Sequence, residues 1–207
     1  MSRFPKIISN ISPDYVIGID EAGRGPLAGP VAVAAVKIGR DFNKNFFRGV
    51  KDSKQTTEEE RKFWFDLAKD AHKNGDLDFS VTLISHLVID KYGMTKAVAL
   101  GIKRNLQKLS APADKSHIFL DGLLKAPEEY VHQLTIIKGD EKVPIISLAS
   151  ILAKVTRDKH MLTFAKKYPQ YGFERHKGYG TKEHREAIKK FGITPIHRVT
   201  FLKNILE

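Results

Sequence analysis

The segment Tyr15–Pro26, YVIGIDEAGRGP, constrains the fold of this chain more than any other stretch. In it an apolar run ends on two adjacent carboxylates, Asp20 and Glu21, and a glycine-rich turn with Arg24 follows. Packing does not explain this pair, because an unpaired carboxylate is costly to bury. At the exposed end of a strand the two acids suit a hard divalent cation, and the turn offers N–H groups and a guanidinium to phosphate.

Strand-like and helical patterns alternate along the rest of the chain. The expected strands cover residues 15–20, 31–38, 77–84, 118–120 and 134–137. The expected helices cover residues 58–74, 85–109 with a break near Gly93, 145–167 and 181–191. Thr57 and Glu60 form a capping box for the first of these helices. The alternation predicts an α/β sheet, and the early strand–turn–strand step makes that sheet mixed rather than wholly parallel.

The glycine turn does not match a nucleotide-binding motif. Gly23, Gly25 and Gly29 lack the G-x-G-x-x-G spacing, and the β-branched run from Val31 predicts a second strand where a dinucleotide site needs a helix. The chain also lacks a Walker lysine motif. These observations argue against a nucleotide cofactor.

Charge and composition narrow the class of partner. Lys and Arg number 35 against 24 Asp and Glu, which gives a net charge of +11. Such a charge serves solubility, but it also favours a polyanionic partner, since clustered cations release counterions from nucleic acid. Charge alone does not distinguish DNA from RNA or anionic lipid. No run approaches the roughly 18 apolar residues of a membrane span, and the absence of cysteine excludes disulfides and thiolate metal sites. We therefore expect a cytoplasmic protein that does not bind membranes.

Three of the expected strands end on or near acidic residues, namely Asp20–Glu21, Asp121 and Asp140. A single Asp at such a place is usually a turn former. Neighbouring strands of one sheet bring their ends together, however, so these carboxylates can meet at one edge. A set of oxygen ligands without cysteine suits Mg²⁺ or Mn²⁺.

The motifs that surround these acids resemble a known family. Residues 19–31, IDEAGRGPLAGPV, are similar to the signature of bacterial type 2 ribonuclease H, the ribonuclease HII family. The resemblance covers roughly residues 15–201 and continues in the expected order through KDSK at 51–54, LDG at 120–122, KGD at 138–140, ASILAKVTRD at 149–158, HKGYGT at 176–181 and HR at 197–198. The sister type, ribonuclease HIII, is less similar, since it typically has Thr where Arg24 stands and carries an extra N-terminal domain.

This resemblance implies a fold and a domain layout. The fold would be α/β and ribonuclease H-like, with a mixed five-stranded sheet flanked by helices and a helical C-terminal part. A single catalytic domain would span residues 1–207, with an N-terminal extension at 1–14 and a substrate-binding segment at about 168–207. We expect a monomer without an obligate protein partner.

The resemblance also implies an activity. The chain would be an endonuclease that hydrolyses the RNA strand of RNA–DNA hybrids and nicks duplex DNA 5′ to embedded ribonucleotides, leaving 3′-hydroxyl and 5′-phosphate ends. Such an enzyme would serve ribonucleotide excision repair and DNA replication. The catalytic and metal-binding residues would be Asp20, Glu21, Asp121 and Asp140, with two Mg²⁺ or Mn²⁺ ions in the site.

Further residues match the substrate-binding elements of the family. Gly23, Arg24, Gly25 and Tyr179 correspond to the residues that read the RNA–DNA junction. Plausible phosphate contacts are Lys51, Lys54, Lys177 and Arg198, although any of them could be simply solvated. Tyr179 could instead be a loop aromatic that covers the core. We expect His176 and His197 to be structural or to contact phosphate, and Lys154 and Arg157 to form ion pairs beside Asp158.

Two functions from other classes remain open at this point. One is a non-catalytic RNA–DNA hybrid-binding protein, against which the complete set of four acids argues. The other is a metal-dependent phosphatase for small esters, against which the positive charge and Tyr179 argue.

Overall fold

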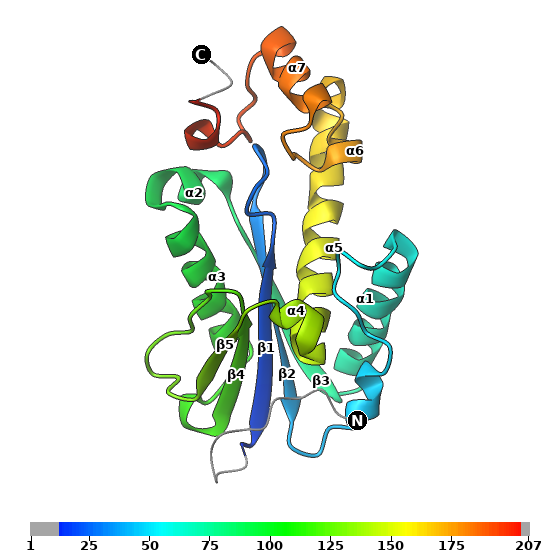
Figure 1. Ribbon diagram of the computed structural model, residues 1–207, viewed down its shortest axis with the longest axis vertical. Coiled ribbons are helices and arrows are strands. Elements are labelled where there is room, and N and C mark those ends of the chain that lie inside the picture. The colour runs from blue at the N-terminus through cyan, green and yellow to red at the C-terminus, as the bar shows by residue number, and fades with distance from the viewer. Residues whose placement is uncertain (1–12, 204–207) are drawn as a thin grey trace.

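A five-stranded mixed sheet forms the centre of the computed structural model, which describes residues 13–203 (Figure 1). The strands are β1 (Tyr15–Ala22), β2 (Val31–Gly39), β3 (Leu77–Ile84), β4 (Ser116–Asp121) and β5 (Gln133–Ile136). Their order is β3-β2-β1-β4-β5. β2 is antiparallel to both β1 and β3, whereas β4 runs parallel to β1 and to β5. The predicted mixed five-stranded sheet is confirmed.

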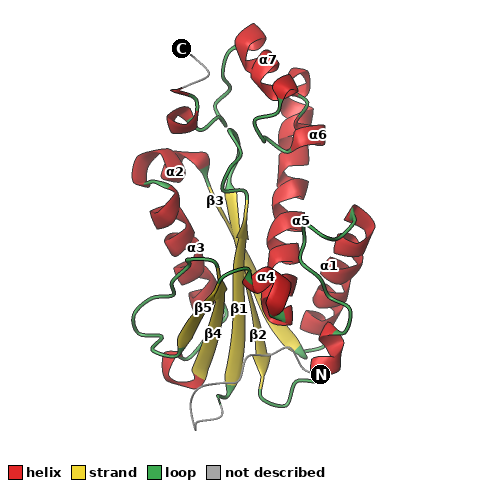
Figure 2. Ribbon diagram, viewed as in Figure 1, coloured by secondary structure: helices red, strands yellow, loops and turns green. Residues whose placement is uncertain are grey.

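Seven α-helices are described, of which the longer ones follow the predicted pattern (Figure 2). They are α1 (Glu58–Lys73), α2 (His86–Tyr92), α3 (Met94–Lys108), α4 (Gly139–Lys142), α5 (Pro144–Lys167), α6 (Phe173–His176) and α7 (Lys182–Phe191). Thr57 and Glu60 form the predicted capping box, and the predicted break at Gly93 separates α2 from α3. Four-residue α4 and α6 were not predicted. Within residues 13–203, no helix is long and apolar enough to cross a membrane.

Helices cover both faces of the sheet, which explains why the central strands are apolar on both sides. Along β1, Val16 packs into the core beneath α1 and α5, whereas Ile17 and Ile19 pack into the core beneath α3. Gly18 lies under α5, and a Cβ added there would lie 2.6 Å from the backbone of Ile145. Glycine therefore lets α5 lie directly on β1.

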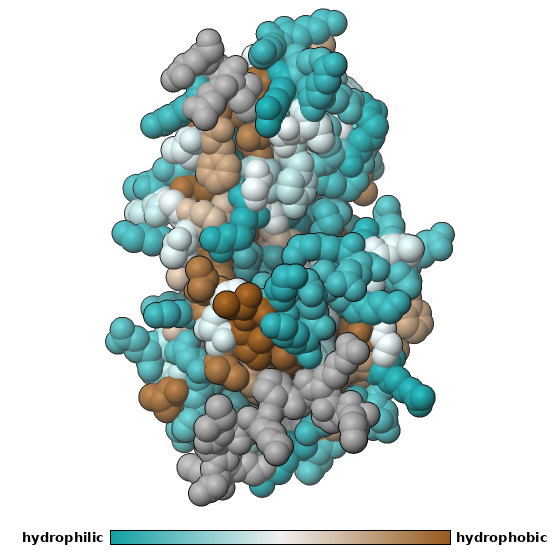
Figure 3. Space-filling model, in the orientation of Figure 1, coloured by the Kyte–Doolittle hydropathy of each residue, from teal (hydrophilic) through white to brown (hydrophobic). Residues whose placement is uncertain are grey.

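α5 continues past the end of the sheet and supports a separate C-terminal layer (Figure 1). A third apolar cluster lies there and joins the end of α5 to α7 and to the turn after β1; its buried members are Leu27, Ala28, Met161, Ala165, Tyr171, Phe173, Ala187, Ile188, Ile196 and Leu202. The face shown in Figure 3 is mostly hydrophilic, with an apolar patch near its middle. The predicted N-terminal extension at 1–14 lies almost wholly outside the described residues.

Candidate active site

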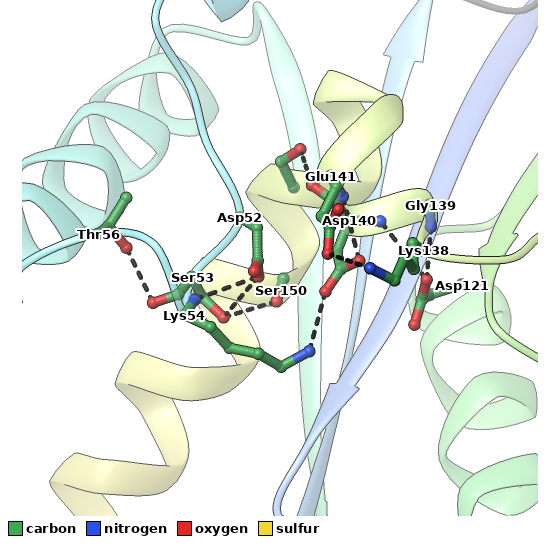
Figure 4. A network of polar contacts seen from close by, with 11 residues as sticks. Asp52, Ser53, Lys54, Thr56, Asp121, Lys138, Gly139, Asp140, Glu141 and Ser150 are labelled. Atoms are coloured by element: carbon green, nitrogen blue, oxygen red, sulfur yellow. Dashed lines mark hydrogen bonds and ion pairs between the residues drawn. The ribbon is translucent and has the colours of Figure 1, made fainter.

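The ends of β1 and β4 place acidic residues side by side. The last residue pair between these parallel strands is Ile19 with Leu120, and Asp20 and Asp121 are the next residues of each strand. Asp140 reaches the same edge from α4. The carboxylate of Asp121 accepts a hydrogen bond from the backbone N–H of Gly139 at 2.7 Å, which ties the start of α4 to the end of β4 (Figure 4). The sheet edge thus gathers acids from three separate segments, as predicted.

Asp20 lies at the centre of this group. It is 4% exposed, and Ser150 on α5 lies close enough to its carboxylate to stabilise the charged form. Burial, and then the nearby charges of Glu21 and Asp121, raise the pKa of Asp20 well above its usual range. Crowded carboxylates of this kind disfavour full ionisation until a cation neutralises them.

Glu21 has one satisfied and one unsatisfied oxygen. Its Oε1 lies 3.2 Å from the guanidinium of Arg24, whereas its Oε2 is buried without a hydrogen-bond partner. Burial raises the pKa of Glu21, although Arg24 opposes the shift. A buried, unpartnered carboxylate oxygen is costly, and a bound cation would satisfy it.

Asp140 is paired with Lys54, which comes from the loop before α1. The Lys54 ammonium lies 3.1 Å from Oδ2 of Asp140, whose side chain is only 4% exposed. Asp52 is buried beside this pair and accepts a hydrogen bond from the backbone N–H of Lys54 at 3.1 Å. The hydroxyls of Ser53 and Ser150 lie 2.8 Å apart, so this loop is also joined to α5 (Figure 4).

The donor set suits a hard divalent cation, because it consists of carboxylate oxygens and one of them is buried without a partner. In the conformation described for residues 13–203, no three His, Asp or Glu side chains surround a common point closely enough to hold an ion. Asp121 accepts a hydrogen bond from Gly139, and Asp140 pairs with Lys54. Metal binding would exchange these protein donors for the cation.

Two buried arginines donate hydrogen bonds to the backbone of the glycine turn after β1. Arg157 on α5 donates to the carbonyl oxygens of Pro30 and Ala28 at 2.9 and 3.1 Å. Arg198 donates to the carbonyl oxygens of Gly23 and Arg24 at 2.7 and 2.8 Å, and also to those of Gly29 and Pro30. The backbone of the turn is thereby fixed while the side chain of Arg24 stays half exposed.

The placement of Arg198 corrects one prediction. Arg198 was expected to contact phosphate, but its side chain is fully buried and its donors are directed at backbone carbonyls. Burial, together with the like charge of Arg157, lowers the pKa of Arg198 to about 9. Arg157 likewise bonds to carbonyls rather than to Asp158, whose ion-pair partner is Lys154 at 2.9 Å. Both arginines therefore fix the backbone of the turn through hydrogen bonds to its carbonyl oxygens.

Gly23 and Gly25 differ in what their positions require. Gly23 has a φ of +95°, and a Cβ there would lie 2.0 Å from Nε of Arg157. Only glycine permits this backbone conformation over the buried guanidinium. A Cβ at Gly25 would meet no atom within 4 Å, so the space beside Gly25 is open to a ligand.

Tyr179 lies next to Arg157, which also binds the backbone of this turn. Its ring is partly exposed, with the Arg157 guanidinium 5.7 Å and the Lys154 ammonium 5.8 Å from the ring centroid. The backbone beside it is joined to the glycine turn, because the N–H of Leu27 donates to the carbonyl of Gly178 at 2.8 Å. The two segments that carry the predicted junction-reading residues are therefore joined by a backbone hydrogen bond.

The remaining predicted phosphate contacts are at the surface. Lys51 is exposed and lines a cavity of about 650 Å³ between residues 44–55 and 141–147. Lys177 is half-buried, and its ammonium donates to the carbonyl of Glu174. His176 and His197 are buried, in agreement with a structural role.

The comparisons with known proteins decide the family. The profile of the family described as Ribonuclease HII matches residues 17–204. Over 186 residues the chain is 47% identical to the Ribonuclease HII of Endomicrobium trichonymphae, which covers 90% of this chain and 84% of that protein. The chain belongs to the ribonuclease HII family. It is therefore a ribonuclease H, a hydrolytic endonuclease, and this family acts on RNA–DNA hybrids and depends on metal ions.

Solved structures agree with this membership. The crystal structure of ribonuclease H2 from Pyrococcus horikoshii OT3 superposes with a TM-score of 0.69 at 30% identity, covering 92% of this chain and 96% of that one. Bst-RNase HIII in complex with Mn²⁺ superposes with a TM-score of 0.72, covering 95% and 70%. Its identity is 23%, so this second likeness concerns the fold alone. The predicted ribonuclease H-like fold is confirmed.

Several residues of this candidate site were not singled out from the sequence. Ser150 and Asp52 support the carboxylates, and both lie inside motifs that were quoted without a role for them. His184 is fully buried, with Nε2 3.1 Å from Nε2 of His197 and Nδ1 2.9 Å from the carbonyl of Tyr179. The sequence offers no sign of this contact, which joins residues from different segments.

Proposed function

We propose that Asp20, Glu21, Asp121 and Asp140 hold two Mg²⁺ or Mn²⁺ ions at this site. With them the chain would hydrolyse the RNA strand of RNA–DNA hybrids and nick duplex DNA 5′ to an embedded ribonucleotide. The buried Oε2 of Glu21, which has no partner beside three further carboxylates, is the observation that carries the proposal. When bound, two such ions activate a water, neutralise charge on the phosphoryl oxygens and support the leaving oxygen, which leaves 3′-hydroxyl and 5′-phosphate ends.

The chain's own residues would orient the substrate against this centre. The open space at Gly25 allows a ribose to approach the backbone, where N–H groups can reach the 2′-hydroxyl that distinguishes RNA from DNA. The Tyr179 ring offers a flat surface for the following sugar. Arg157 and Arg198 would keep the turn rigid, so that the scissile phosphate is held at a fixed place.

The same proposal gives the C-terminal segment and three surface lysines a role in substrate binding. Residues from about 168 onward would form the substrate-binding segment of a single catalytic domain, since their apolar cluster also contains Leu27 and Ala28 of the glycine turn. Lys51, Lys54 and Lys177 would contact phosphates of a hybrid or of duplex DNA with embedded ribonucleotides. We further propose a cytoplasmic monomer.

The decisive test of the metal centre is Asp20→Asn. This variant keeps the size of the side chain but removes a charge at the centre of the site. Cleavage of a hybrid should fall by more than ~100-fold, because even residues behind a metal ligand typically contribute 10–100-fold. Affinity for the hybrid, measured by fluorescence anisotropy, should change little, because phosphate contacts supply most of it. Asp114→Asn, an exposed acid before β4, is the matched control and should cleave like the parent.

The outcomes separate this function from its rivals. Parent-like turnover of Asp20→Asn would refute the assignment of the centre. A parent chain that binds a hybrid but does not cut it in Mg²⁺ or Mn²⁺ would be a binding protein only. Hydrolysis of a chromogenic phosphate ester in place of the hybrid would identify a phosphatase.

A further inference from the structure

The Lys54 ammonium lies among the acids that are expected to hold metal. Its side chain is 80% exposed, yet the ammonium lies 3.1 Å from the buried carboxylate of Asp140. An exposed lysine is free to adopt many conformations, and holding one of them costs side-chain entropy. Its position over Asp140 therefore reflects the attraction of the site (Figure 4).

Hydrogen bonds fix the loop that carries Lys54 beside Asp140. The buried carboxylate of Asp52 accepts the backbone N–H of Lys54, and the Ser53 hydroxyl bonds to Ser150 on α5. Ser150 also lies near the carboxylate of Asp20 and favours its charged form. One short chain of contacts thus fixes the loop to the helix that supports the central acid of the site.

Lys54 places a positive charge against this group of acids. The ammonium lies 3.1 Å from the carboxylate of Asp140, and the buried carboxylate of Asp52 accepts the backbone N–H of the same residue. Carboxylates crowded at one sheet edge repel one another, and a cation in contact with one of them reduces that repulsion.

We propose that Lys54 is a resident counter-ion of the active site, which divalent metal displaces from Asp140. The inference rests on the proposed function, because it takes the four acids as the metal ligands. In the metal-free protein the ammonium relieves repulsion among the carboxylates. When metal takes over that task, the ammonium is released at the mouth of the site, where it can contact a substrate phosphate. Metal binding and the phosphate contact of Lys54 are thereby coupled.

The experiment is titration of Mn²⁺ into the parent, Lys54→Met and Lys51→Met by calorimetry at fixed ionic strength. Methionine keeps an unbranched side chain of nearly the same length without its charge. Lys54→Met should bind Mn²⁺ about fivefold more tightly, which is the size expected from removing one partly exposed ion pair. Lys51→Met removes an equal charge from the preceding lysine of the loop. It measures the long-range effect of charge alone, and it should bind Mn²⁺ like the parent. Lys54→Arg retains the charge and should not gain affinity.

Thermal unfolding gives a second readout on the same proteins. Lys54→Met should unfold at a lower temperature than the parent in metal-free buffer, and saturating Mn²⁺ should remove most of that difference. A lysine that served only as a phosphate contact would change neither quantity. A lysine that served only folding would lower the unfolding temperature equally with and without Mn²⁺.

Two results would overturn the inference while leaving the metal centre intact. The first is equal Mn²⁺ affinity for the parent and Lys54→Met. The second is Mn²⁺ binding by Lys51→Met that is tighter than the parent's by the same factor as that of Lys54→Met. Equal Mn²⁺ affinity for the parent and Asp20→Asn would instead overturn the proposed metal centre. The two failures are therefore distinguishable.

Discussion

At the scale of single residues, Tyr179 combines an exposed ring with a fixed backbone. Its carbonyl lies 2.9 Å from Nδ1 of His184, and its N–H donates to the carbonyl of His176. Tyr179→Ala should therefore remove the ring without moving the chain. We expect this variant to cleave a duplex with one ribonucleotide at least tenfold more slowly than the parent, because a misplaced scissile phosphate strongly lowers the rate. Affinity for the duplex should fall much less.

Single-turnover cleavage of matched duplexes with one or four ribonucleotides is the measurement for Tyr179. Tyr179→Phe is the control, and it should retain much of the activity if ring stacking matters more than the phenolic hydroxyl. Equal rates for Tyr179→Ala and the parent on the single-ribonucleotide duplex would show that Tyr179 is a packing residue.

At the scale of elements, the contact of α5 with β1 sets the geometry of the site. α5 carries Ser150 to Asp20, and it can do so because Gly18 leaves no side chain between helix and strand. Gly18→Ala should lower the free energy of unfolding by about 1–3 kcal/mol, the usual effect of an added methyl group in a tightly packed contact. It should also slow cleavage, because the helix must move away from the strand.

Urea denaturation of Gly18→Ala and Gly39→Ala measures this effect. Gly39 ends β2, and a Cβ there would meet no atom within 4 Å, so this control should unfold like the parent. Should the two variants prove equally stable, the close approach of α5 to β1 would not constrain the site.

At the scale of the whole molecule, the sequence predicts periodic elements and local motifs well. The sheet, the longer helices and the break at Gly93 were all predicted to within about two residues at most boundaries. Four-residue α4 and α6 are too short to show a period. The burial of Arg198 could not be predicted, because arginine is rarely buried and its partners lie more than 160 residues away in the chain. The chemistry assigned to the four acids stays a prediction until it is measured.

The net charge of +11 leads to a prediction for the whole surface. Hybrid affinity should fall steeply with salt, since each neutralised phosphate contributes about −0.9 to the slope of log affinity against log salt. Lys51→Ala should make that slope shallower by nearly this amount, because Lys51 is exposed at the cavity beside the site. Lys108→Ala is the control. Lys108 is exposed at the end of α3, and the chain then enters β4 at Ser116, the end of that strand away from Asp121. Its removal should leave the slope unchanged. Anisotropy titrations over a range of salt concentrations provide the slopes. If both variants keep the parent slope, the hybrid does not run past Lys51, whereas an equal change in both would mean that net charge alone governs binding.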